Sequence, residues 1–276
     1  MSMDAVKDQV CIVTGGGRGI GRVIALKLAE AEARVIVVSR TQSQLDETVS
    51  LIEDLGAHAL AITGDVSNPN DIQRITQQVQ KQFGRVDLLV NNAGMSGPKG
   101  PMWEIDLSRW WDCAETNLRG SLLFMAAVLP DMVSRKSGRI VNVSSGAGLA
   151  KRPFAAAYSI TKAVLTSLSE NTAAEVKEHG ISIFSIGPGL VKTAMTEYAR
   201  DSEEGSTWTP QIGRGIEEGR DVPPENAAKL IVTLASGKAD VLSGCFLRPT
   251  DDLDQLIQHA EDIAKNSLYT LRLQRL

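Results

Sequence analysis

Histidine and cysteine are scarce in this chain of 276 residues, which contains three of each. Cys11, Cys113 and Cys245 lie far apart in apolar or mixed segments. Such scattered thiols are typical of a reduced, cytoplasmic protein rather than of a disulfide framework. No cluster of cysteine, histidine and carboxylate residues has the spacing of metal ligands, so we expect no bound metal.

The sequence also has no long apolar run and no excess of positive charge. No segment approaches the ~20 apolar residues that a membrane-spanning helix needs, and the first residues have no apolar centre like that of a signal peptide. The formal net charge is −4, and no segment forms a stripe rich in lysine and arginine. We therefore expect a cytoplasmic protein that binds neither membranes nor nucleic acid.

Short β-branched runs alternate with longer helical patterns along most of the chain. Several of the runs are almost continuously apolar, as in strands that are covered on both faces. This alternation predicts an α/β fold, a Rossmann-like, doubly wound parallel sheet of about seven strands with helices on both faces. Strands are expected at 10–13, 35–38, 59–63, 86–90, 139–143, 181–186 and 245–247, and helices at 20–33, 42–55, 69–83, 108–133, 156–179 and 224–234.

Two segments depart from this alternation of strands and helices. Residues 194–222 are polar and contain several glycines, and a connection of this length predicts a functional lid or a mobile loop. Its acidic part, Glu203 and Glu204, is expected to be a solvated surface.

The second segment is the tail from Thr250, which is expected to cap a helix. We place a dinucleotide-binding and catalytic domain at residues 1–250 and a C-terminal helical extension at 251–276. The extension is expected to pack on the body or on a partner subunit, because it is apolar for a free tail. Its apolar residues are Leu253, Leu256, Ile257, Ala260, Ile263, Leu268, Leu271, Leu273 and Leu276.

A glycine-rich turn follows the first expected strand and directly precedes a helical pattern. Glycines permit a tight turn and let the backbone approach a pyrophosphate, while the helix start offers free N–H groups. In this strand–turn–helix context the turn predicts a dinucleotide site. The residues concerned are Gly15, Gly17, Arg18, Gly19, Ile20 and Gly21.

The end of the second strand indicates which dinucleotide binds. NAD sites place a carboxylate there for the adenosine ribose. Here the strand continues into Ser39, Arg40 and Thr41, with no acid at its tip. Arg40 can pair with a 2′-phosphate, and Arg18 could add a second positive charge. We expect NADP(H), with NAD(H) as the alternative cofactor.

Tyr158 and Lys162 lie four residues apart in a helical pattern, which places them on one helix face. A nearby ammonium favours the ionised form of a phenol, which otherwise titrates near pH 10. The pair could then give a proton to a carbonyl or take one from an alcohol. Ser144 and Ser145 end the preceding strand, and the carboxyl ends of parallel strands are where ligands bind.

These motifs together resemble the classical short-chain dehydrogenase/reductase family, over residues 10–247. The resemblance is carried by TGGGRGIG at 14–21, NNAG at 91–94, SS at 144–145, YSITK at 158–162 and PGLVKT at 188–193. It implies that Tyr158 is the general acid/base, that Lys162 assists it and binds the nicotinamide ribose, and that Ser145 orients the substrate. Asn117 matches the asparagine that helps to hold a proton-relay water.

The resemblance also assigns the remaining cofactor contacts, and it implies a homodimer or homotetramer in which helices 108–133 and 156–179 pair between subunits. The chain departs from the family's usual pattern in its long C-terminus. The cofactor contacts, besides Tyr158, Lys162 and those of the glycine turn and the second strand, are Asp65, Val66, Asn92, Ala93, Gly94, Pro188, Gly189, Val191 and Thr193.

Three functions remain open: an NADPH-dependent reductase of ketones or 3-oxoacyl groups, a sugar, polyol or alcohol dehydrogenase, and a non-catalytic cofactor-binding protein. Because Tyr158 and Lys162 are both present, the last is disfavoured. Three tryptophans, Trp103, Trp110 and Trp111, are expected to serve packing. The expected walls of a substrate pocket are Met95, Ser96, Leu149, Phe154 and Met195.

Overall fold

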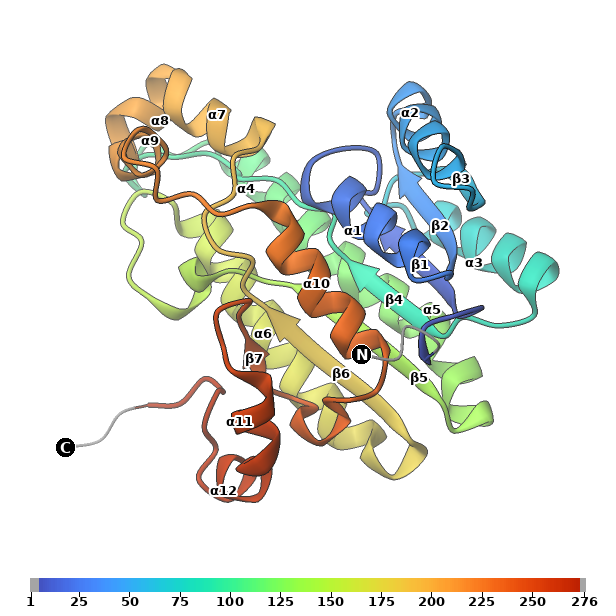
Figure 1. Ribbon diagram of the computed structural model, residues 1–276. Helices are drawn as coiled ribbons and strands as arrows, with labels where there is room; N and C mark the ends of the chain where they lie inside the picture. Colours follow the sequence, from blue (N-terminus) through green and yellow to red (C-terminus); the bar gives the residue numbers. More distant parts are fainter. Residues whose placement is uncertain (1–4, 274–276) are drawn as a thin grey trace.

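A single parallel sheet runs through the centre of the molecule in the computed structural model, which describes residues 5–273 (Figure 1). Its strand order is β3-β2-β1-β4-β5-β6-β7, and every neighbouring pair is parallel. This confirms the predicted Rossmann-like sheet. The strands are β1 (Val10–Thr14), β2 (Arg34–Ser39), β3 (Ala59–Thr63), β4 (Leu88–Asn91), β5 (Gly138–Val143), β6 (Ile181–Ile186) and β7 (Phe246–Leu247).

Strand β1 shows why the strand sequences are continuously apolar. Cys11 and Val13 face one buried cluster, whereas Val10 and Ile12 face another on the opposite side of the sheet. Alternate residues of a strand point to opposite faces, so a strand covered on both sides needs apolar residues throughout.

Helices cover both faces of the sheet. Residues of α1 (Gly19–Glu30), α2 (Gln42–Glu53) and α10 (Pro224–Ala235) belong to one core cluster. Residues of α3 (Pro69–Phe83), α5 (Gly120–Arg135) and α6 (Ala156–Val176) belong to the other.

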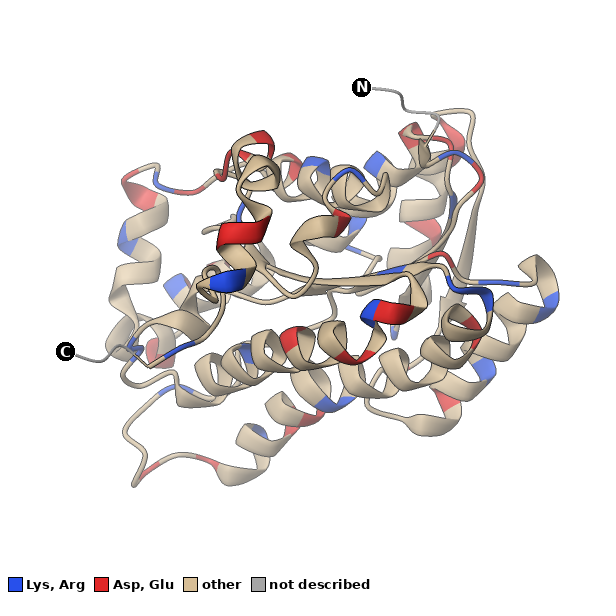
Figure 2. Cartoon of the chain, turned by 90° about the horizontal axis from the view of Figure 1, so that it is seen from below, with Lys and Arg blue, Asp and Glu red and all other residues tan. Residues whose placement is uncertain are grey.

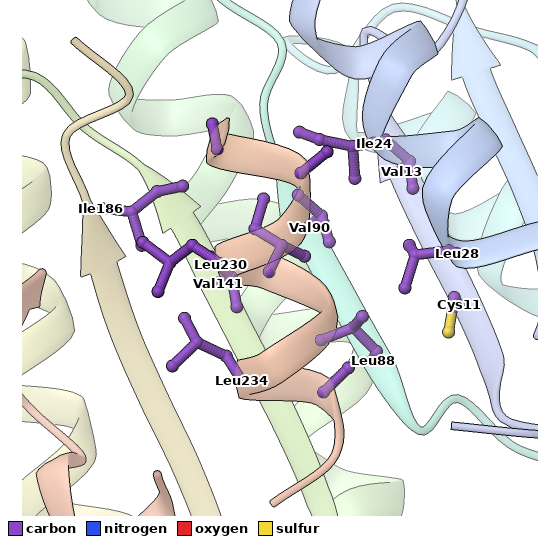
Figure 3. Packing of buried hydrophobic residues seen from close by; sticks show 14 of the residues in the cluster. Cys11, Val13, Ile24, Leu28, Leu88, Val90, Val141, Ile186, Leu230 and Leu234 are labelled. Atoms are coloured by element: carbon purple, nitrogen blue, oxygen red, sulfur yellow. The ribbon is translucent and has the colours of Figure 1, made fainter. Parts of the chain in front are cut away.

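Helix α10 illustrates the packing of the first face. Figure 3 shows Leu230 and Leu234 on this helix, beside Val141 and Ile186 of the neighbouring strands. Complete burial of such a side chain contributes about 1.5–3 kcal/mol, so this layer holds the strands in fixed positions.

The helix expected at 108–133 is interrupted in the structure. It consists of α4 (Leu107–Ala114), a π-helical turn η2 (Glu115–Arg119) and α5. The helix expected at 156–179 ends as α6 at Val176 and continues as a 3₁₀ turn, η4 (Lys177–His179). Other 3₁₀ turns are η3 (Gly146–Leu149) and η5 (Asp240–Leu242).

Residues 194–222 were expected to form a lid or mobile loop, and the loop reading is wrong. They form α7 (Ala194–Asp201), α8 (Glu203–Trp208) and α9 (Pro210–Glu217). Hydroxyl caps begin the first two, since Thr193 accepts from the Thr196 amide and Ser202 from the Gly205 amide. Figure 1 shows the three helices together at the end of the sheet to which the arrowheads of β4 and β6 point.

The tail forms two short helices rather than one, α11 (Leu253–Gln258) and α12 (Ala260–Lys265). The cap of α11 is Asp252, which accepts from the Gln255 amide, and not Thr250 as expected. Leu256 and Ile263 are buried in the same core cluster as α1 and α10. Leu268 and Leu273 are exposed, and Leu276 lies outside the described residues. Contact of this tail with a partner subunit stays a prediction.

Charged residues of both signs are interspersed along the helices seen in Figure 2. The three cysteines are buried free thiols. Within residues 5–273, no group of three histidine, cysteine or carboxylate residues could hold a metal ion. No helix in the same range is both long and apolar enough to span a bilayer.

Candidate active site

The glycine turn folds tightly against the residues that follow β4. Gly15 and Gly19 have positive φ angles of 64° and 55°, which suit glycine. A Cβ atom at Gly21 would lie 2.2 Å from the carbonyl oxygen of Gly15, so a side chain has no room there. The side-chain amide of Asn92 donates to the carbonyl of Thr14 at 2.9 Å, which fixes the turn next to the NNAG segment.

The turn also lies next to the end of β2. A Cβ atom at Gly17 would lie 3.1 Å from Ser39 Oγ. The guanidinium of Arg40 lies 3.7 Å from a carboxylate oxygen of Asp65, and its side chain is 76% exposed. The structure therefore brings Gly17, Ser39, Arg40 and Asp65 together, as a site for the adenosine end of the cofactor requires. Arg18 is exposed at the start of α1, Thr41 precedes α2, and Val66 is buried.

Residues Asn92, Ala93 and Gly94 connect this region to the centre of the sheet. The backbone amides of Asn92 and Ala93 both donate to Thr14 Oγ, at 2.9 and 3.0 Å. A Cβ atom at Gly94 would lie 3.2 Å from Asn117 Oδ1 and 3.6 Å from Lys162 Nζ. A glycine at 94 thus allows the lysine and the asparagine to approach the strand edge.

Asn117 is buried in the π-helical turn η2, and its side chain holds the segment after β4 in place. Its Oδ1 accepts from the amide of Met95 at 2.8 Å, and its Nδ2 donates to the carbonyl of the same residue at 2.9 Å. Nδ2 also lies 3.1 Å from Thr161 Oγ1 on α6. π-helical turns inside helices often mark functional sites. Here the turn links Asn117 to the helix that carries Tyr158 and Lys162.

Tyr158, Ser145 and Lys162 converge above the end of β5. Ser145 forms a side-chain hydrogen bond with Tyr158. The ammonium of Lys162 donates to the carbonyl of Val143 at 2.7 Å and lies 5.8 Å from the centre of the Tyr158 ring. Ser144 points elsewhere, since its hydroxyl contacts the Lys162 carbonyl and Thr166 Oγ1. The geometry thus separates the two serines, and Ser145 is the one beside the phenol.

Burial has the largest effect on the pKa values of both Lys162 and Tyr158. It lowers the pKa of Lys162 to about 8 and raises the pKa of the half-buried Tyr158, an effect that the hydrogen bond with Ser145 opposes. The sequence pattern had suggested that the ammonium would favour the phenolate. In the structure the desolvation of both groups outweighs this attraction, and Tyr158 stays a protonated phenol at neutral pH.

The low pKa of Lys162 predicts a specific change of stability with pH. Between about pH 8 and 10.5 the unfolded chain still holds a lysine proton that the native state has released, so the native state gains stability as the pH rises. The free energy of unfolding of the unmodified protein, relative to that of Lys162→Met, should therefore increase by about 1.4 kcal/mol per pH unit in this window.

Urea denaturation at pH 7, 8, 9 and 10 measures this difference, and effects common to both proteins cancel. Below pH 8 the difference should be constant. A constant difference from pH 7 to pH 10 would show that the lysine titrates normally in the folded protein.

The segment after β6 reaches back to the glycine turn. Gly189 has a φ of 90°, and Val191 is buried. Thr193 Cγ2 would lie 3.6 Å from a Cβ atom at Gly19, so residues 188–193 run from the end of β6 to the glycine turn.

Some expectations about the surroundings of the site were wrong in part. Trp103 and Trp111 are 81% and 62% exposed, so they are not packed in the core of this chain, although the Trp111 ring contacts that of Trp110 with centres 5.1 Å apart. Glu203 is exposed as expected, whereas the Glu204 side chain is only 19% exposed and accepts from Arg109 and from the backbone of Lys99. Of the expected pocket walls, Phe154 is partly exposed and stacks on Trp208, with ring centres 4.8 Å apart. The other four, Met95, Ser96, Leu149 and Met195, are half-buried.

Lys99 is the residue of this region that sequence reasoning missed. It is buried, although it lies in a short segment rich in glycine and proline, GPKGP at 97–101. The available signal was a lysine placed between a proline and a glycine.

Comparison with known proteins agrees with this geometry. The family model for short chain dehydrogenases matches residues 9–204. A short chain dehydrogenase of Pseudocercospora fijiensis is 30% identical over 97% of this chain and 90% of its own length. A 3-oxoacyl-acyl-carrier-protein reductase of Vibrio cholerae is 32% identical over 87% of this chain and 94% of its own.

A solved structure gives the same picture. A variant of actinorhodin polyketide ketoreductase, crystallised with NADPH, superposes with a TM-score of 0.79 at 30% identity, covering 87% of this chain and 95% of that protein.

Proposed function

The chain belongs to the short-chain dehydrogenase/reductase family and is an oxidoreductase, and we propose that it uses NADPH to reduce ketones or 3-oxoacyl groups. One observation carries the proposal: a buried lysine, a tyrosine and a serine converge at the strand edge beside the glycine turn. This is the set of groups that carbonyl reduction with proton transfer needs.

In the proposed reaction each residue has a separate task. The cofactor, when bound, supplies the hydride. Ser145 donates a hydrogen bond to the substrate carbonyl and holds it at the Tyr158 hydroxyl. Tyr158 gives its proton to the carbonyl oxygen as negative charge develops there. Lys162 binds the nicotinamide ribose and supports the proton donor, and Asn117 fixes the segment that borders the site.

The protonation state of Tyr158 suits its role as the proton donor in reduction. Burial raises the pKa of this phenol, so it stays in the form that donates a proton at neutral pH. Oxidation of an alcohol would need the phenolate instead. A sugar, polyol or alcohol dehydrogenase that uses the same residues in reverse is the second candidate, and an assay in both directions distinguishes the two.

The residues around the glycine turn fit a dinucleotide, because α1 begins at Gly19 directly after the turn and Gly19 has no side chain to cover the free N–H groups of the helix start. For NADP rather than NAD, the support is the exposed guanidinium of Arg40 beside Ser39, with Arg18 near the start of α1. Two named relatives are a 3-oxoacyl reductase and a ketoreductase with NADPH, which agrees with this choice.

A spectrophotometric assay at 340 nm tests the proposal. NADPH and NADH are each offered with ketones and oxoacyl thioesters, and NADP⁺ and NAD⁺ with sugars, polyols and simple alcohols. We expect NADPH to be consumed with at least one class of carbonyl compound, and NADH more slowly. Turnover of polyols alone would favour the dehydrogenase, and use of NADH alone would contradict the cofactor assignment.

A further inference from the structure

A buried ammonium with no hydrogen-bond acceptor lies next to the candidate active site. Lys99 is 7% exposed, and its Nζ has no hydrogen-bond partner within residues 5–273. Burying a charge is costly unless it is paired, so a lysine of this kind is typically kept for a ligand. Burial also lowers the pKa of Lys99, and an anion bound to it would reverse that effect.

The nearest carboxylate is already engaged by other groups. Glu204 accepts from the backbone amide of Lys99, from Arg109 Nη2 at 2.9 Å and from the Tyr198 hydroxyl at 3.3 Å. It forms no ion pair with the Lys99 ammonium, which lies 5.2 Å from the centre of the Tyr198 ring instead. Lys99 and Arg109 together outweigh Glu204 by one positive charge, so the place suits a single negative charge.

The segment that carries Lys99 is fastened on both sides to the surroundings of Tyr158. Before it, Gly97 packs so closely on Ala157 that a Cβ atom would lie 3.0 Å from the alanine side chain. After it, the Gly100 amide donates to the carbonyl of Phe154 at 2.9 Å. Ala157 directly precedes Tyr158 in α6, so the segment of Lys99 borders the proton donor.

Helices α7 and α8 cover this segment. Tyr198 of α7 and Glu204 of α8 contact Lys99, and Trp208 of α8 stacks on Phe154. The Tyr198 ring thus faces the ammonium, and Trp208 lies beside the next residue, with its Nε1 3.7 Å from a Cβ atom placed at Gly100. These rings could contact a hydrocarbon chain.

We propose that Lys99 binds a carboxylate of the substrate, so that the enzyme selects oxo acids over neutral ketones. This rests on the proposed function, because it assumes that the substrate carbonyl lies at Tyr158. An ammonium offers three donors and no acceptor, which matches carboxylate oxygens. The single net positive charge favours a monoanion over a doubly charged phosphate.

A comparison of acids with their esters tests the proposal. Keto acids of five to eight carbons, with the ketone next to the terminal methyl group, and their methyl esters are assayed with NADPH. For the unmodified enzyme we expect kcat/KM to be at least about tenfold higher for the best acid than for its ester. Lys99→Met should lower kcat/KM for the acid by about 10- to 100-fold and change that for the ester by less than about threefold.

Two further variants serve as controls. Lys99→Arg keeps the charge and should keep a preference for the acid, whereas Lys151→Met removes an exposed lysine and should change neither substrate. Because Lys99→Met removes an unpaired buried charge, its melting temperature should not fall below that of the unmodified protein. Equal losses for acid and ester, or a fold that fails with either change at position 99, would overturn the proposal in favour of a structural role.

Binding without turnover separates this proposal from the proposed function. Calorimetry with hexanoate and hexanamide should show hexanoate binding to the unmodified protein, none to Lys99→Met and no binding of the amide. If hexanoate binds in this way but no ketone is reduced, the carboxylate site stands and the proposed reaction fails. If ketones are reduced without preference for acids and hexanoate does not bind, the reaction stands and the carboxylate site is refuted.

Discussion

Replacing Tyr158 by phenylalanine should lower the turnover of any carbonyl substrate by about three orders of magnitude, within the 10²–10⁴-fold range of general acid catalysis. The change removes one oxygen atom and with it the proton donor that Ser145 contacts. The hydroxyl of Ser144 cannot take its place, because it is bound to the Lys162 carbonyl and to Thr166. Steady-state kinetics with the best ketone of the assay panel measure the loss.

NADPH binding should survive this replacement, because the glycine turn and Arg40 lie on other elements of the fold. Cofactor fluorescence titration checks this point. Tyr269→Phe is a matched control, since this tyrosine lies in the C-terminal tail and its backbone carbonyl, not its ring, accepts from the Phe246 amide. More than a tenth of the activity remaining in Tyr158→Phe would show that another group donates the proton.

The convergence on which this experiment depends could be predicted from the sequence. Motifs that follow parallel strands meet at one edge of the sheet, so Asn92, Ser145 and Tyr158 had to approach each other once the strands were identified. The strands themselves were identifiable because burial on both faces favours apolar residues at nearly every position, as in residues 10–13 of β1. Strand β6 is buried throughout although it contains Ser182 and Ser185.

The interruption of the helix before β5 could not be predicted in this way. Residues 115–119 contain no proline or glycine that would mark a break, and the π-helical turn there coincides with the hydrogen bonds of Asn117 to Met95, a tertiary contact. Helices α7 to α9 were not predicted for a different reason. All three are short, and α8 and α9 contain glycines. Gly205 of α8 lies so close to Ala199 that a Cβ atom would be 2.2 Å from the alanine carbonyl oxygen.

The burial of charged groups was the property that was hardest to predict from the sequence. Lys99 is covered by helices that begin about a hundred residues later in the chain, so its own neighbours in the sequence do not reveal it. The direction of the Tyr158 pKa has the same origin. The lysine four residues away predicts a lowered pKa, whereas the packing around the phenol raises it.

Changing Arg40 to aspartate should convert the cofactor preference. The Arg40 guanidinium is 76% exposed and only 3.7 Å from Asp65, a pairing loose enough to leave its donors free for a 2′-phosphate. Hydrogen bonds to charged groups contribute about 1.5–3 kcal/mol, so their loss should lower kcat/KM with NADPH by about 10- to 100-fold. The new carboxylate would in addition repel the phosphate and could accept hydrogen bonds from the ribose of NADH. The ratio of kcat/KM values for the two cofactors should therefore move toward NADH by about two to three orders of magnitude.

Two further variants show how much of the change in cofactor preference comes from the lost arginine and how much from the added negative charge. Arg40→Leu removes the attraction without adding repulsion, so it should weaken the use of NADPH and leave that of NADH unchanged. Arg34→Asp introduces the same charge at the other end of β2, where Arg34 pairs with Asp8, and should leave the ratio unchanged because it is remote from the glycine turn. If Arg40→Asp and Arg34→Asp gave the same ratio, Arg40 would not contact the phosphate. Arg18 at the start of α1 would then be the remaining arginine of the glycine turn, because Arg22 is already paired with Glu47.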